Sequence, residues 1–345
     1  MRRRSPAVVL GVGLASLVVT MLLGVRFGAA SVDAAKAVAI LAKSLGFATR
    51  TPFRPWEATI LLDVRLPRVV TGAFVGAGLA LSGAALQAMF RNPLADPGVL
   101  GVASGASLGA VAALHLGLAA FEAWALPGLA ILGAAGTAFT IYAIASRRGH
   151  LPIGTLLLSG VAVGSLASAL TSLLLSLSLE EYEQGRQTFR WLMGGLDART
   201  WSDALLVAPT TLIGSAIVVA SSRELDALLL GEMQAVALGV DVPRVRRRLI
   251  FATSVVIGGA VAVAGVIGFV GLVVPHLLRL LVGPSHAVLL PACLLFGGAF
   301  VVSCDLLCRT VVAPEELRLG IMTASLGAPF FLFLLLSRRR EVSIE

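Results

Sequence analysis

The sequence predicts an all-α protein that crosses a lipid bilayer as a bundle of ten helices. The chain has 345 residues, of which 57% are hydrophobic and only 13% are charged, a balance that no water-soluble fold needs. Several continuous apolar runs approach or exceed the length of about 20 residues that crosses the hydrocarbon core as a helix. The strands of a membrane β-barrel would instead alternate in polarity over roughly 10 residues. The runs therefore exclude a barrel and favour a single transmembrane domain over residues 1–345.

The first expected span, residues 6–25, follows the basic residues Arg2–Arg4. A positive start before an apolar run is also typical of a cleaved signal peptide, and residues 28–31 weakly resemble a cleavage site. Because the run is long for a signal peptide and further spans follow, we interpret it as a membrane span with a cytoplasmic N-terminus. Residues 31–45 have a helical composition and are expected to lie along the membrane surface.

Small residues mark the next two expected spans, residues 66–89 and 98–118. Glycines spaced by four residues let helices approach closely in lipid. They occur as Gly72 and Gly76 in the second span and as Gly101, Gly105 and Gly109 in the third. Both spans are therefore expected to pack tightly inside the bundle.

The turn between these spans carries more polar residues than a simple connection needs. Two prolines and a glycine end the second span, and the pair Asp96-Pro97 is suited to begin the third. Close helix packing does not explain why Arg91, Asn92 and Asp96 gather in so short a turn.

Seven further apolar segments complete the predicted bundle. They are residues 123–146, 151–179, 202–221, 248–268, 269–282, 287–307 and 319–337.

The segments between spans follow the positive-inside rule when the N-terminus is placed in the cytoplasm. Both chain termini are then cytoplasmic, and the net charge of +8 is accounted for by loops, so no nucleic-acid partner is expected. Four arginines at the outer ends of spans are exceptions, namely Arg65, Arg68, Arg309 and Arg318. Composition alone favours anchoring to lipid headgroups over contact with acidic groups of an external partner.

The stretch 225–248 is the least lipid-like part of the chain. It is interrupted by Gly231, Gly239 and Pro243, and it ends in the basic run Arg244–Arg248. A structured basic loop in the cytoplasm is typical of a surface offered to a partner. An equally good interpretation is a basic connector that only orients the chain. The pattern by itself does not separate the two.

The sequence lacks the motifs of the common catalytic and cofactor-dependent classes. It contains neither the phosphate-binding Gly-x-x-x-x-Gly-Lys-Ser/Thr loop nor His-Glu-x-x-His. Cys293, Cys304 and Cys308 lie in one apolar region at spacings that match no zinc site, so they are expected to be packing residues. Asp305 is the best intramembrane ionisable residue, and an ion-coupled transporter would show more of them. A non-enzymatic transport path driven by a partner fits best.

Eight motifs in order resemble the FecCD family, the permeases of ABC importers for iron-siderophores, haem and vitamin B12. The resemblance runs from about residue 60 to 337. The matching stretches are Arg65–Arg68, Gln87–Gly101, Leu158–Gly160, Trp191–Gly195, Leu230–Val240, Gly268–His276, Asp305–Arg309 and Gly320–Phe330.

This resemblance implies a homodimer of ten-helix subunits around a central path in the bacterial inner membrane. It implies two ATP-binding-cassette subunits, which hydrolyse ATP with magnesium, on the cytoplasmic side. A periplasmic substrate-binding protein would dock on the outside, and the permease would hold no permanent cofactor or metal.

The resemblance also implies roles for individual residues. The residues implied to contact the ATPase are Leu230, Gly231, Glu232, Ala235, Leu238 and Gly239. The residues implied to dock the binding protein are Arg65, Arg68, Arg309 and Arg318. This role differs from the anchoring to lipid headgroups that composition alone favours. Arg318 departs from the family pattern, where proline is common. The cytoplasmic gates are expected at Asn92 and Leu94 and at Ile153 and Gly154.

For the cargo, similarity to haem permeases favours haem import by alternating access. A ferric siderophore and then cobalamin are the alternatives, and an ion-coupled secondary transporter is the competing class.

Overall fold

The computed structural model confirms an all-helical, multi-pass protein. It describes residues 5–342 except 29–31, 50, 99–100, 122–123, 147–151, 179–181 and 314, and this part of the chain contains no strand. The predicted inside arginines Arg2–Arg4 and Arg147–Arg148 lie outside the described residues.

Seven described helices are long and apolar enough to cross a membrane. They are α1 (Pro6–Arg26), the continuous run of α3 (Pro55–Thr59), η1 (Ile60–Arg65) and α4 (Leu66–Phe90), and then α7 (Ala125–Ala145), α8 (Ile153–Ser178), α10 (Trp201–Ala220), α13 (Val242–Ala264) and α15 (His286–Thr310).

Shorter apolar helices occupy the remaining three predicted spans. They are α5 (Val102–His115), α14 (Val270–Val282) and the apolar part Leu319–Leu332 of α16 (Leu319–Val342). With the other seven they reproduce the predicted set of ten in order. The other short helices are α2 (Ala34–Ser44), α6 (Leu118–Phe121), α9 (Tyr182–Leu192), α11 (Ser222–Leu230) and α12 (Glu232–Ala237).

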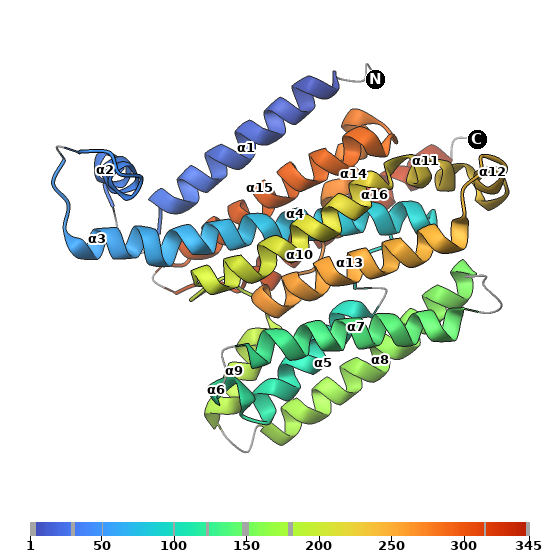
Figure 1. Ribbon diagram of the computed structural model, residues 1–345, viewed down its shortest axis with the longest axis horizontal. Coiled ribbons are helices and arrows are strands. Elements are labelled where there is room, and N and C mark those ends of the chain that lie inside the picture. Colours follow the sequence, from blue (N-terminus) through green and yellow to red (C-terminus); the bar gives the residue numbers. More distant parts are fainter. Residues whose placement is uncertain are drawn as a thin grey trace.

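The long helices run roughly along one axis and form two groups (Figure 1). One group contains α1, α4, α10, α13, α14, α15 and α16, and the other contains α5, α7 and α8. The groups meet where α7 and α5 pack against α13. Figure 1 shows α2 end-on, so it crosses the bundle axis, as expected for a helix along a membrane surface.

The two ends of the bundle carry different short elements (Figure 1). We call the end with α11 and α12 the α12 end, and the opposite end, near α2 and α3, the α3 end. The turn after α4 and the start of α8 both lie at the α12 end. Because helix α15 runs from one end to the other, it connects the two regions described below.

The predicted glycine faces form close helix contacts. Gly76 of α4 lies against Gly297 of α15, and a Cβ atom on either glycine would overlap the carbonyl group of the other. Gly105 and Gly133 meet in the same way between α5 and α7. Backbones at this distance gain van der Waals contact that larger side chains would prevent. The three cysteines are buried free thiols, as expected for packing residues.

A π-helical turn, η1, leads into α4. Pro67 causes it, because proline has no N–H to donate and its ring displaces the preceding carbonyls. The Leu66 N–H bonds to Leu61 O, five residues back. In the same pattern an N–H at position 67 would bond to the Leu62 carbonyl, but Pro67 has none. The Leu62 carbonyl instead accepts the indole N–H of Trp201 at 3.0 Å.

Two boundary expectations were wrong. The basic run Arg244–Arg248 does not end a loop, because α13 begins at Val242 with its N-terminus capped by the Asp241 side chain. Asp96 does not begin the third span, since α5 starts at Val102 after Gly101. The polar segment after α8 contains a further short helix, α9, which was not predicted from the sequence.

Candidate functional site

Two glycines give α12 its separate position at the α12 end. Gly231 joins α11 to α12 with φ 120° and ψ 160°, a conformation that is essentially confined to glycine. Gly239 ends α12 with φ 82°. Its N–H bonds to Val236 O while the Val240 N–H bonds to Ala235 O, which is the Schellman arrangement. These bonds satisfy the last carbonyls of a helix too short to be stable alone.

The α11–α12 segment exposes large apolar side chains. Leu230 is 63% exposed and Met233 is 81% exposed, and Val236 and Leu238 are also exposed. Ala235 is fully buried and fixes the opposite face of α12. Of the residues predicted to contact an ATPase, Leu230 and Leu238 are therefore available, whereas Gly231 and Ala235 shape the backbone. A cluster of exposed apolar side chains rimmed by charge is typical of a protein contact.

The basic run of α13 holds this segment in place. Arg246 is buried and its Nη2 donates to Glu232 Oε2 of α12 at 2.9 Å. Arg248 Nη2 donates to Glu224 Oε1 of α11, also at 2.9 Å. The sequence alone did not decide whether these arginines belong to a partner surface or to a simple connector. In the structure Arg246 and Arg248 bind the two short helices to α13.

The first predicted gate lies in a tight turn after α4. Arg91 adopts the left-handed conformation at φ 49°, and the Asn92 side chain accepts a hydrogen bond from Leu94 N at 2.9 Å. Asp96 accepts in the same way from Gly98 N at 2.9 Å. Arg91 Nη1 lies 3.6 Å from the position that a Cβ on Gly231 would occupy. The turn therefore lies directly beside the link between α11 and α12.

Asp96 has no cationic partner among the described residues. Burial raises the pKa of its carboxyl group, and the hydrogen bond from Gly98 N only partly offsets this. The second predicted gate, Ile153 and Gly154, forms the first turn of α8 at the same end of the bundle. A Cβ on Gly154 would meet nothing within 4 Å, so this turn is not constrained by close contacts at that position.

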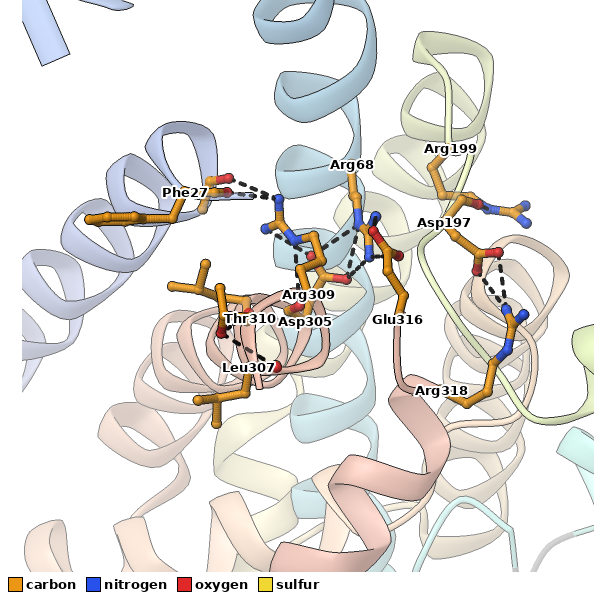
Figure 2. A network of polar contacts seen from close by, with 12 residues as sticks. Phe27, Arg68, Asp197, Arg199, Asp305, Leu307, Arg309, Thr310, Glu316 and Arg318 are labelled. Atoms are coloured by element: carbon orange, nitrogen blue, oxygen red, sulfur yellow. Dashed lines mark hydrogen bonds and ion pairs between the residues drawn. The ribbon is translucent and has the colours of Figure 1, made fainter. Parts of the chain in front are cut away.

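Arg68 lies at the α3 end between two carboxylates (Figure 2). Its Nε and Nη2 donate to Asp305 Oδ1 of α15 at 3.0 and 2.8 Å. Its Nη1 and Nη2 donate to Glu316 of the loop before α16 at 3.2 and 3.0 Å. The Asp305 side chain is 2% exposed and that of Glu316 is 37% exposed. One carboxylate partner is therefore buried and the other faces the surface.

Arg309 and Arg65 hold the end of the first helix. Arg309 Nη1 donates to Gly24 O at 3.1 Å, and Arg65 Nη1 donates to Val25 O and Arg26 O at 3.1 and 2.7 Å. The last carbonyls of a helix have no partners within it, and cations near this end are stabilising. Arg309 Nη2 also makes an ion-pair contact of 3.0 Å with Asp305 Oδ2. Three of the predicted docking arginines are thus buried and engaged within the chain.

Arg318, the fourth predicted docking residue, pairs with Asp197 (Figure 2). Its Nη1 lies 3.0 Å from both carboxylate oxygens, and both side chains remain partly exposed. Burial alone would raise the pKa of the Asp197 carboxyl, but the Arg318 guanidinium outweighs it and holds that pKa below its ordinary value.

Replacing Asp197 with asparagine is expected to change how stability depends on pH. A carboxyl whose pKa is lowered by folding stabilises the protein above its unfolded pKa, and this contribution is lost as the pH falls through the folded pKa. The difference in Tm between wild type and Asp197→Asn should be largest near neutral pH, should begin to fall near the ordinary pKa of 3.8, and should vanish only below the lowered pKa of the folded state. Thermal unfolding in detergent measures it. Glu183→Gln, in an exposed pair with Arg186, is the control, and a Tm difference independent of pH would contradict the prediction.

The sequence pointed to most of these positively charged residues but not to their partners. Glu316 and Asp197 lie in loops 248 and 121 residues away from the arginines that they bind. Asp305 was marked as an ionisable residue within a span and as part of the Asp305–Arg309 motif, but not as a partner of Arg68. The i, i+4 spacing of Asp305 and Arg309 on one helix was the available signal.

Residues 16–337 match the FecCD transport family. The cobalamin import system permease protein of Halobacterium salinarum is 50% identical over 289 residues, which cover 84% of this chain and 76% of the relative. The hemin transport system permease protein of Yersinia pestis is 41% identical over 297 residues, which cover 82% of this chain and 85% of the relative.

A solved structure has the same fold. It is described as an inward-facing conformation of a metal-chelate type ABC transporter, and it superposes with a TM-score of 0.84 at 33% identity. The match covers 96% of this chain and all of that one.

Proposed function

The chain belongs to the FecCD transport family and is a permease subunit of a type II ABC importer, and from this premise we propose that it imports a metal-containing macrocycle, cobalamin or haem, by alternating access. Membership of the family implies an ATPase and a substrate-binding protein as partners. ATP hydrolysis is then carried out by another subunit.

The exposed α12 is the observation that carries this proposal. An ATPase that drives transport needs a surface on the permease that it can bind and displace. Leu230, Met233 and Leu238 supply exposed apolar contacts, and Gly231 and Gly239 allow the short helix to stand apart. We therefore assign the α11–α12 segment to the ATPase and the α12 end to the cytoplasm. With this orientation we propose that both termini are cytoplasmic and that the protein spans the inner membrane.

The path is proposed to follow α8 at the centre of a homodimer. Much of this helix is uncovered, and its uncovered surface carries four serines spaced by three or four residues, Ser165, Ser168, Ser172 and Ser176. Lipid-facing surfaces avoid such a polar seam, whereas interfaces and paths accept it. The two predicted gates at the α12 end would close this path toward the cytoplasm.

Cobalamin is the first candidate cargo because the archaeal relative named for cobalamin import is 50% identical. Haem is the second, favoured by the relative named for hemin transport. A ferric siderophore is third and rests on the metal-chelate description of the solved structure.

Reconstitution tests the function and the cargo together. Proteoliposomes would contain the permease and its ATPase, with the binding protein outside, and would receive cobalamin, haem or a ferric siderophore in turn. ATP-dependent accumulation of cobalamin is the expected result. Accumulation of haem alone would replace the first candidate by the second. Accumulation of none of the three, with an active ATPase, would reject the proposed function.

The arginines of the α3 end are proposed to dock the binding protein through acidic side chains. Because Arg65, Arg68 and Arg309 are buried in the fold, charge reversal there would damage the protein as well as the contact. Arg318 is 22% exposed and gives a cleaner test.

Arg318→Gln is expected to weaken docking by about twofold to fivefold at low salt, the effect of removing one exposed ion pair. The difference should disappear at high salt because exposed charges are screened. Binding of the substrate-binding protein to permease in nanodiscs measures it. Arg244→Gln, an exposed arginine at the α12 end, is the matched control. Unchanged affinity at low salt would argue that Arg318 serves the fold alone.

A further inference from the structure

One carboxylate joins α11 to the first residue of α15. Asp226 Oδ1 accepts a hydrogen bond from the His286 backbone N–H at 2.9 Å and lies 2.6 Å from Nδ1 of the same residue. A carboxylate only accepts, so Nδ1 is the nitrogen that carries the proton. The His286 side chain is 0% exposed, whereas that of Asp226 is 40% exposed. The contact thus reaches from the surface of α11 into the bundle.

This arrangement is an N-cap supplied by another helix. The first N–H groups of a helix lack partners within it, and a carboxylate near them is favoured by hydrogen bonding and by the helix dipole. Ser285, the residue placed to cap α15, makes no such side-chain bond. Asp226 takes that role although it lies 60 residues earlier in the chain. A displacement of α11 therefore acts directly on the end of α15.

Helix α15 carries this attachment to the opposite end of the bundle. Its 25 residues span about 37 Å at 1.5 Å per residue. It packs along α4 and α1, with the close Gly297–Gly76 contact near its middle. Its last turns carry Asp305 and Arg309, which hold Arg68 of α4 and the end of α1. The same continuous helix thus connects the α11–α12 segment to the arginines of the α3 end.

We propose that Asp226 is a positioning residue that couples movement of the α11–α12 segment to α15, and through α15 to the α3 end where the binding protein docks. The inference rests on the proposed role of α12 as the contact with the ATPase. It adds a named attachment, Asp226 with His286, and a named element, α15, through which a movement at one end reaches the other.

A purely stabilising role of the Asp226 cap would lead to a different result. Loss of the cap would then lower Tm and would reduce ATP hydrolysis and uptake together. Loss of a mechanical attachment leaves the ATPase contact on α12 intact, so hydrolysis continues while uptake for each ATP falls. Glu224 provides a matched control, because it lies on the same helix and its carboxylate binds Arg248 of α13 rather than α15.

The test compares Asp226→Ala with Glu224→Ala in proteoliposomes that contain the ATPase and the binding protein. Asp226→Ala removes the acceptor oxygens and the charge, and it is expected to keep ATP hydrolysis within about twofold and to lower uptake for each ATP by about tenfold or more, the factor associated with losing one charge-assisted hydrogen bond. Glu224→Ala loosens α11 from α13 but not from α15, so it should change hydrolysis and uptake together and leave uptake for each ATP near the wild-type value. His286→Asn is the second variant if Asp226→Ala folds poorly. Its backbone N–H still donates to Asp226, so a smaller loss of uptake is expected.

A fluorescent label provides a readout that a structural role would not move. Cysteines introduced at the exposed Met233 and Val311 report the two ends of the molecule, since the natural cysteines are buried. ATP binding should change both signals in wild type and only the Met233 signal in Asp226→Ala. Equal uptake for each ATP in wild type and Asp226→Ala, or a retained Val311 signal in this variant, would overturn the inference. If wild type itself takes up no cargo, the proposed function fails first and the inference falls with it.

Discussion

Replacing Asp305 with leucine is expected to lower the free energy of unfolding by about 3–5 kcal/mol. The Asp305 carboxylate is buried and lies within 3.0 Å of the guanidinium groups of both Arg68 and Arg309. Its removal leaves these buried cations without their shared counter-charge, and only Arg68 keeps a second carboxylate partner, Glu316. Unfolding of the purified permease in mixed detergent micelles measures the loss.

Two further variants show whether charge is the cause. Glu316→Gln removes the exposed partner of Arg68 and should cost at most about 1 kcal/mol. The double variant Arg68→Met with Asp305→Leu should recover part of the loss, because replacing both members of a buried pair by apolar groups is far less costly than removing one. A stability of Asp305→Leu equal to wild type would show that water already reaches these arginines.

Replacing Gly231 with glutamate is expected to abolish coupled uptake, with a loss of more than about tenfold, while ATP hydrolysis continues. At φ 120° and ψ 160° any side chain is strained, and a Cβ here would overlap the Gln234 side chain. The link would have to change course and carry α12 out of place. Uptake for each ATP hydrolysed, measured in proteoliposomes, gives the result.

Gly239→Asn is the matched control for this variant. Gly239 has φ 82°, a Cβ there would meet nothing within 4 Å, and asparagine tolerates the left-handed region. This control should retain most of the wild-type uptake. Coupled uptake at the wild-type level in Gly231→Glu would remove α12 from the transport mechanism.

The bundle itself was predictable because lipid imposes a simple pattern. A span must be long, apolar and helical, so the order of the ten apolar helices could be read from hydropathy and the close contacts from glycine spacing. Boundaries were less predictable. Arg246 shows why, because it reads as a loop residue until Glu232 of α12 provides its buried partner.

The pairing of charges could not be predicted from one sequence. Arg68 and Asp305 are 237 residues apart, and no local rule relates them. Composition singled out four arginines at the predicted outer ends of spans but not their engagement with Asp305, Glu316, Asp197 and the carbonyls of α1. Asp226 gave no signal at all, because a single acid on a short polar helix looks like an ordinary surface residue.

The π-turn at Ile60–Arg65 has a consequence for how this protein tolerates insertions and deletions. A π-turn is an α-helix that holds one additional residue, and that residue rotates the preceding helix by about 100° relative to the following one. A homologue shorter by one residue at the exposed Val64 would keep every packed face of α4 in register, because the deletion precedes that helix. It would instead rotate α3 and the residues before Val64 relative to α4, including the buried Leu61 and the Leu62 carbonyl that accepts the Trp201 N–H.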